Sequence, residues 1–217
     1  MGTTITKEQN AAAAKAATEN LSSRFSEAGV SVESVAHSAG KAYEFVRVTC
    51  APDQWRAIAK HLRHELGVNH CAMITGTHFP SGGSDRGWEV VYHMHRWPIH
   101  NVKAHTMTVH VGEKLEGDDI PMEFEIVIPL PAGETPSVPS IQDIWVGADW
   151  NEKETWDLVG IDFEGHVNMH RVLNPHDSPP GFHPLQRQHL IRYHDFNEMY
   201  DDPQGFGRKP VDEGRVK

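Results

Sequence analysis

The stretch MEFEIVIPL, residues 122–130, places an apolar residue at every second position. A period of two puts these side chains on one face of a strand, so the stretch predicts a strand that is buried on one side. Residues 88–94 and 107–111 show the same alternation, and residues 70–77 predict a further strand. Strands that are apolar on one face only are typical of a mostly antiparallel or mixed sheet that helices cover on one face.

Two stretches predict helices next to this sheet. In residues 52–67 the apolar side chains recur at helical spacing, basic residues take the other side, and Gly67 is suited to end the helix. The apolar set is Trp55, Ile58, Ala59, Leu62 and Leu66. Residues 8–26 are rich in alanine but have a thin apolar stripe, so this helix is expected to be a loosely attached arm or a clasp on a neighbour. Because short strands are also expected at 30–35 and 43–49, the predicted fold class is α+β.

Proline and glycine divide the chain. Four prolines after residue 128 are expected to end the sheet region, since proline cannot donate to a sheet ladder. They are Pro129, Pro131, Pro136 and Pro139. Frequent proline and glycine after residue 174 leave that segment without a core of its own. The expected parts are an N-terminal helical arm at 1–28, an α+β domain at 29–173 and an extended C-terminal tail at 174–217.

Composition excludes several classes of function. The chain has 30 acidic residues against 20 Lys and Arg, a net charge of −10, so no nucleic-acid partner is expected. Its two cysteines, Cys50 and Cys71, are too few for a cysteine-ligated iron–sulfur cluster or a four-cysteine zinc site, and both are expected to be buried thiols. No stretch approaches about 18 uninterrupted apolar residues, and the N-terminus lacks the apolar core of a signal peptide. Contact with a membrane is therefore expected only through partners.

Residues 136–173 hold the densest pattern, PSVPSIQDIWVGADWNEKETWDLVGIDFEGHVNMHRVL. The spacing of Asp149 and Glu152 predicts a capping box, with a helix from Trp150 that ends before Gly160. A tryptophan on each side and carboxylates among apolar residues suggest a helix between its own domain and a partner. The acids are then expected to meet basic groups or backbone amides of that partner. In the alternative interpretation they pair with Arg171 or a lysine of the same chain.

This run resembles the signature of the 30 kDa family, also called the C subunit, of respiratory complex I, the proton-pumping NADH:quinone oxidoreductase. Pro139-Ser140-Ile141 and Ile144-Trp145 are similar to the family pattern before the helix, and His183-Pro184-Leu185 to the element after it. The motif residues expected at an interface are Asp149, Glu152, Glu154, Asp157, Gly160, Gly165, His166, Arg171, His183 and Pro184.

The resemblance implies a non-catalytic subunit of the peripheral arm, at the cytoplasmic face of the plasma membrane. It implies no catalytic, cofactor-binding or metal-binding residue in this chain. FMN, the iron–sulfur clusters, quinone and NAD(P)H or another electron donor would be bound by partner subunits. The expected partners are the quinone-site subunit (49 kDa-like, or D) and neighbouring cluster-bearing subunits. Val167 and the run Gln186–His189 depart from the family pattern, so the equivalent subunit of a membrane-bound hydrogenase or formate hydrogenlyase is an alternative.

Two other readings start from single residue types. His93 and His95 share one face of an expected strand, and with His100, His105 and His110 they could bind zinc. Glu154, Asp157 and His166 are residue types that suffice for acid–base catalysis, although no nucleophile motif accompanies them. We expect neither a metal site nor a hydrolase.

Overall fold

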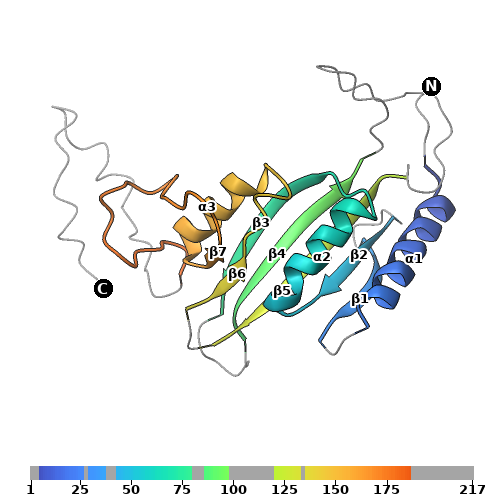
Figure 1. Ribbon diagram of the computed structural model, residues 1–217, viewed down its shortest axis with the longest axis horizontal. Helices are drawn as coiled ribbons and strands as arrows, with labels where there is room; N and C mark the ends of the chain where they lie inside the picture. Colours follow the sequence, from blue (N-terminus) through green and yellow to red (C-terminus); the bar gives the residue numbers. More distant parts are fainter. Residues whose placement is uncertain are drawn as a thin grey trace, which may run out of the picture.

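The computed structural model of the chain describes residues 5–26, 29–37, 43–79, 86–97, 120–132 and 135–186. Its main element is a mixed five-stranded sheet with strand order β1-β2-β5-β4-β3 (Figure 1). β2 and β5 are parallel, and the other neighbouring pairs are antiparallel. The strands are β1 (Ser31–Ala36), β2 (Glu44–Thr49), β3 (His70–His78), β4 (Arg86–Arg96) and β5 (Met122–Pro131). The predicted α+β class and mixed sheet are confirmed, while the strand expected at 107–111 lies outside the described residues.

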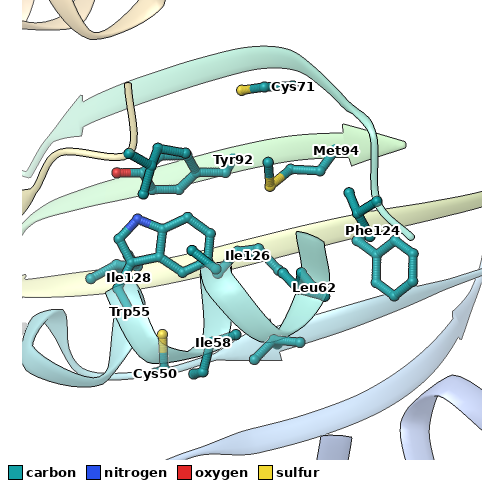
Figure 2. Close-up of a cluster of buried hydrophobic side chains, with 14 of the residues drawn as sticks. Cys50, Trp55, Ile58, Leu62, Cys71, Tyr92, Met94, Phe124, Ile126 and Ile128 are labelled. Atoms are coloured by element: carbon teal, nitrogen blue, oxygen red, sulfur yellow. The ribbon is translucent and has the colours of Figure 1, made fainter. Parts of the chain in front are cut away.

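The core lies between this sheet and α2 (Pro52–His64). The alternate apolar residues of β4 and β5 point to α2 and are almost completely buried. Trp55 of α2 meets Tyr92 of β4, with ring centroids 4.6 Å apart (Figure 2). Cys50 and Cys71 are free thiols in this core, and burial raises the pKa of each to about 12. The expectation of buried thiols is therefore confirmed.

β5 continues through Pro129 and ends at Pro131, one residue beyond the predicted strand 122–130. Val127 accepts a hydrogen bond from the Cys50 amide at 3.1 Å, so its backbone faces β2. Pro129, two residues further, faces the same way, but the pairing with β2 ends at Val127. The missing N–H of Pro129 therefore lies where no neighbouring strand requires it, and the pairing with β4 continues.

The N-terminal helix α1 (Lys7–Arg24) packs on the sheet rather than forming a loose arm. Thr6 and Gln9 make a capping box at its start. Ala14, Ala17 and Leu21 are buried in the same core cluster as α2. The two alanines are small, which allows close packing but makes the apolar stripe appear weak in the sequence.

A smaller unit covers the β3 side of the sheet. It consists of β6 (Ser137–Pro139), α3 (Ala148–Val159) and β7 (Asp162–Glu164), with β6 and β7 parallel. α3 packs against β3 (Figure 1). A Cβ atom at Gly76 of β3 would lie 2.8 Å from Thr155 Cγ2 and 2.9 Å from Ile161 Cδ1, so a side chain there would separate the two layers.

Candidate functional site

The candidate site is α3 together with residues 160–186, which fold back over it. The helix begins at Ala148, two residues earlier than predicted. Gly147 is the N-cap, and no side chain caps the helix, so the capping box predicted from Asp149 and Glu152 is wrong. The predicted end is confirmed, since Gly160 follows the helix in the left-handed conformation with φ of 86°.

Asp157 organises the C-terminal half of the site. Its carboxylate is fully buried and accepts a hydrogen bond from Arg171 Nη1 at 2.7 Å. Oδ2 also accepts from the backbone amides of residues 172, 173 and 174, at 3.1, 2.9 and 2.9 Å, and the Asn174 side-chain amide donates to Oδ1 at 2.9 Å. Burial alone would raise the pKa of Asp157, but the hydrogen bonds from Asn174, Leu173 and Arg171 outweigh it and hold this pKa well below its ordinary value.

The donors to Asp157 all come from its own chain. The alternative reading, in which Arg171 answers the acid, is therefore correct for this residue. Three consecutive backbone amides and a guanidinium around one carboxylate hold residues 171–174 against the middle of α3.

Aromatic contacts add to this attachment. The Arg171 guanidinium lies 5.6 Å from the centroid of the Trp156 ring, and the His183 ring meets the same tryptophan edge-on at 5.9 Å. His183 Nδ1 lies 3.0 Å from the Asp157 carbonyl oxygen. The family-motif residues Arg171 and His183 thus contact α3 from two separate parts of the loop.

The turn at His183 and Pro184 caps the C-terminus of α3. The Gln186 amide donates to the His183 carbonyl at 3.0 Å, which places Pro184 at the second position of a turn. The Leu185 amide and the Gln186 side chain then donate to the carbonyls of residues 158 and 159, at 2.9 and 2.7 Å. The turn therefore satisfies carbonyl groups that a helix leaves without partners at its C-terminus.

A Gly160→Ala substitution is expected to lower the free energy of unfolding by about 1–2 kcal/mol, because a Cβ atom is strained at positive φ. The new atom would also lie 2.6 Å from Gln186 Nε2 and 2.8 Å from His183 Cδ2. Urea unfolding of the chain would measure the loss. Gly181→Ala is a matched control, since Gly181 also has a positive φ of 75° but has open space around it. Equal losses would show that the contact with His183 and Gln186 adds nothing.

Glu152 organises the N-terminal half of the site. It is fully buried and accepts from the Ser140 hydroxyl at 2.6 Å and from the Ile141 amide at 2.8 Å. Burial raises the pKa of Glu152 to about 7, although these two hydrogen bonds act in the opposite direction. The hydrogen-bond donors to this carboxylate also come from the same chain, from the segment that leads from β6 to α3.

His166 lies beside Glu152, with only 1% of its side chain exposed. Its Nδ1 accepts from the Asn168 amide at 3.2 Å, so Nε2 carries the hydrogen. That hydrogen points to Asp149, whose carbonyl and carboxylate oxygens lie 3.3 and 3.4 Å from Nε2, while Glu152 Oε2 lies 3.9 Å away. Gly165, at φ of 81°, makes the turn that directs His166 under the helix.

The solvent side of α3 carries Trp150 and Glu154. Trp150 is half exposed, and its indole N–H donates to Glu154. Asp149 pairs with Lys153 at 2.8 Å. The hydrogen-bonded partner of Glu154, Trp150, thus lies on this outward side of the helix.

The structure places the candidate acid–base residues Glu154, Asp157 and His166 in three separate settings. Glu154 bonds to Trp150, Asp157 to the 171–174 loop, and His166 to Asp149. These three side chains share no hydrogen-bonded cluster, which removes the geometric basis for a hydrolase.

The structure describes only two of the five histidines that were considered as zinc ligands. His93 and His95 lie on β4, on the sheet face opposite the helices, and His100, His105 and His110 lie outside the described residues. Within the described ranges, no three His, Cys, Asp or Glu side chains are grouped so that they could hold a metal ion. In the same ranges no helix is long and apolar enough to span a bilayer.

Sequence reasoning missed three contributors to the site. Asn174 supplies both an amide and a side chain to Asp157, Ser140 supplies a hydroxyl to Glu152, and Gly76 allows α3 to approach β3. Ser140 and Asn174 lie in or beside the recognised motif, which was a usable signal. Gly76 gave no usable signal for this contact. A glycine within a strand indicates that another segment packs closely against it, but the sequence does not show which segment.

Comparisons with known proteins identify the family. The model of the respiratory-chain NADH dehydrogenase 30 kDa subunit family matches residues 48–195, more than half of the chain. The chain belongs to this family. The matched range contains α2, the sheet from β3 onward, and the whole of α3 with its attached loop.

The names of matched relatives agree with this family assignment. The NADH-quinone oxidoreductase C subunit of Chloroherpeton thalassium is 31% identical over 68% of this chain and 52% of its own length. The NADH-quinone oxidoreductase C/D protein of Gluconacetobacter diazotrophicus is 51% identical over 32% of this chain and 11% of its own. The chain thus spans about half, or less, of these relatives. A solved chain of a membrane-bound sulfane sulfur reductase, an archaeal respiratory membrane complex, has a TM-score of 0.58 at 13% identity and covers 94% of this chain and 98% of its own. That likeness shows the fold alone.

Proposed function

We propose that this chain is a non-catalytic subunit of the peripheral arm of a membrane-associated NADH:quinone oxidoreductase. The observation that carries the proposal is the family match over residues 48–195. The relatives with the NADH-quinone oxidoreductase name support quinone as the acceptor and NADH as the donor. In the proposed complex, partner subunits bind FMN, the iron–sulfur clusters and the two substrates, and connect this chain to the cytoplasmic side of the membrane.

The quinone-site (D) subunit is the proposed direct partner. In the Gluconacetobacter relative, the name C/D describes one protein that contains both parts. Fusion keeps two domains at a high effective concentration, which is useful when they bind each other. This chain would then correspond to the C part and bind the D part as a separate protein.

The described geometry fits a positioning role. Most polar side chains of the family motif hold residues 160–186 on α3 and contact groups of their own chain. A rigid loop of this kind can place a neighbouring subunit accurately, and small displacements near a reacting centre cost large factors in rate. Trp150 and Glu154 are left on the outward side of the helix to contact that neighbour.

The chain is expected to co-purify with a D-type subunit and with cluster-bearing subunits when it is tagged in its native host and membranes are solubilised in mild detergent. Mass spectrometry would identify the partners, and the tag expressed alone is the control. The tagged chain after dissociation from the complex is expected to carry no flavin and no iron. Recovery of the chain without these subunits would contradict the proposal, and stoichiometric iron or flavin in the isolated chain would contradict its non-catalytic part.

A further inference from the structure

The sheet face opposite α1 and α2 carries a hollow. β1, β2, β3, β4 and β5 each direct alternate side chains onto this face, and none of the described helices lies on it. The hollow has a volume of about 660 Å³. Among its lining residues are Glu33, Arg47, Met73, Glu89, His93 and Glu125.

A second hollow of about 410 Å³ continues this surface at the ends of β4 and β5. His93 pairs with Glu125 in the strand register, and His95 pairs with Glu123 one step further along the same face. The first pair lines the larger hollow, and the second pair lines the smaller one. Ile5 and Asn10 of the N-terminal segment also line the smaller hollow. We call the sheet residues that line the two hollows the open face.

Large apolar side chains are exposed along the open face. Met73 in the first hollow is 47% exposed, and Tyr43 and Trp97 in the second are 39% and 48% exposed. The rings of Trp97 and His95 are stacked, with centroids 5.3 Å apart. The rings of His95 and His70 are also stacked, with centroids 6.0 Å apart. Aromatic residues and methionine are enriched at the centres of protein interfaces, and a stacked, partly immobilised tryptophan loses little entropy on binding.

The charge of the open face is acidic. Five glutamates line the two hollows at positions 33, 44, 89, 123 and 125. Arg47 lies between two of them, with Nε 2.6 Å from Glu125 and Nη1 3.5 Å from Glu33. His37 lies 3.0 Å from Glu123. The described lining of the two hollows holds more glutamates than arginines, which are Arg47 and Arg96, so the face is complementary to a partner that brings basic groups together with apolar ones.

We propose that the open face is a docking surface for a basic, partly apolar segment of a partner subunit. The proposal deepens the proposed function and rests on it, because it assigns one face of the chain to contact within the complex. Met73, Tyr43 and Trp97 would supply apolar contact area, and the glutamates would select basic groups. The motif residues on α3 lie in the other layer of the molecule, so the two surfaces can be tested separately.

Two substitutions at Met73 test the sign of the partner's charge. Met73→Lys and Met73→Glu remove the same apolar side chain and add opposite charges at one point of the open face. Co-purification of partner subunits with the tagged full chain is expected to fall about tenfold or more for the lysine variant, and less than about threefold for the glutamate variant. Since Met73 is about half exposed, both variants are expected to unfold at the same temperature as the unsubstituted chain.

The matched control uses Ala16, which is exposed on α1 in the helical layer. Ala16→Lys and Ala16→Glu are expected to leave co-purification unchanged. Partner recovery that is unaffected by either Met73 substitution, reduced equally by both, or reduced more by glutamate would overturn the proposal while the unsubstituted chain still binds its partners. A dimer of the isolated chain that Met73→Lys converts to a monomer would also overturn it, in favour of a second copy. If the unsubstituted chain recovers no partner, the proposed function itself has failed.

Discussion

An Asp157→Ala substitution is expected to lower the free energy of unfolding of the isolated chain by about 3–5 kcal/mol, the range for removing one member of a buried charge pair. The carboxylate is fully buried and holds Arg171 and three consecutive backbone amides. Its removal leaves a guanidinium and amide groups without an acceptor, and residues 171–174 lose their attachment to α3. Urea unfolding would measure the loss, and limited proteolysis would detect cleavage near residue 173.

Asp162→Ala is the matched control, because Asp162 is exposed on β7 only a few residues away. It is expected to change the free energy of unfolding by less than about 0.5 kcal/mol. If Asp157→Ala were equally harmless to the isolated chain and impaired only assembly, Asp157 would face a partner, as the sequence alone had suggested.

A Glu152→Gln substitution is expected to stabilise the chain at pH 8 by about 2–3 kcal/mol and to have no effect below about pH 5. Burial raises the pKa of Glu152 from 4.5 to about 7. Between these values the folded chain holds a proton that the unfolded chain has released, so the stabilisation present below pH 4.5 is lost as the pH rises through 7. Glutamine stays neutral and can still accept from the Ile141 amide.

Chemical unfolding at pH 5, 6, 7 and 8 would measure this difference, and subtraction of the two curves removes the titration of the histidines common to both proteins. Glu164→Gln is the control, because Glu164 is an exposed acid that accepts a hydrogen bond from Ser137. A glutamine variant that is less stable than the unsubstituted chain at pH 8 would show that the Glu152 carboxylate is needed in its charged form.

Several features of the fold followed from local pattern. A period of two in 122–130 and a period near 3.6 in 52–67 were enough for β5 and α2, because the buried side of each element has large apolar residues at regular spacing. α1 was misjudged because its buried residues are, apart from Leu21, alanines and an asparagine. Asn10 bonds to both backbone groups of Glu44, a contact that no periodicity predicts.

The motif around α3 was recognisable from the sequence. The sequence did not show which of its acidic side chains face a partner and which face their own chain. Asp149, Asp157 and Glu152 could each have faced a partner or their own chain, since helical spacing places a side chain on a face without saying what covers that face. The covering groups come from residues 140–141 and 171–174, which approach the helix only in the folded chain.

By itself the sequence determined the α+β class, most strand and helix positions, and membership of the family, because these depend on periodicity and on the order of motif residues along the chain. Only the tertiary structure decided that β5 lies between β2 and β4, that Asp157 and Glu152 are satisfied within the chain, and that the described helices all lie on one side of the sheet, leaving a hollow on its other face. These depend on contacts between residues far apart in sequence. Their partners are selected by the packing of whole elements rather than by local propensity.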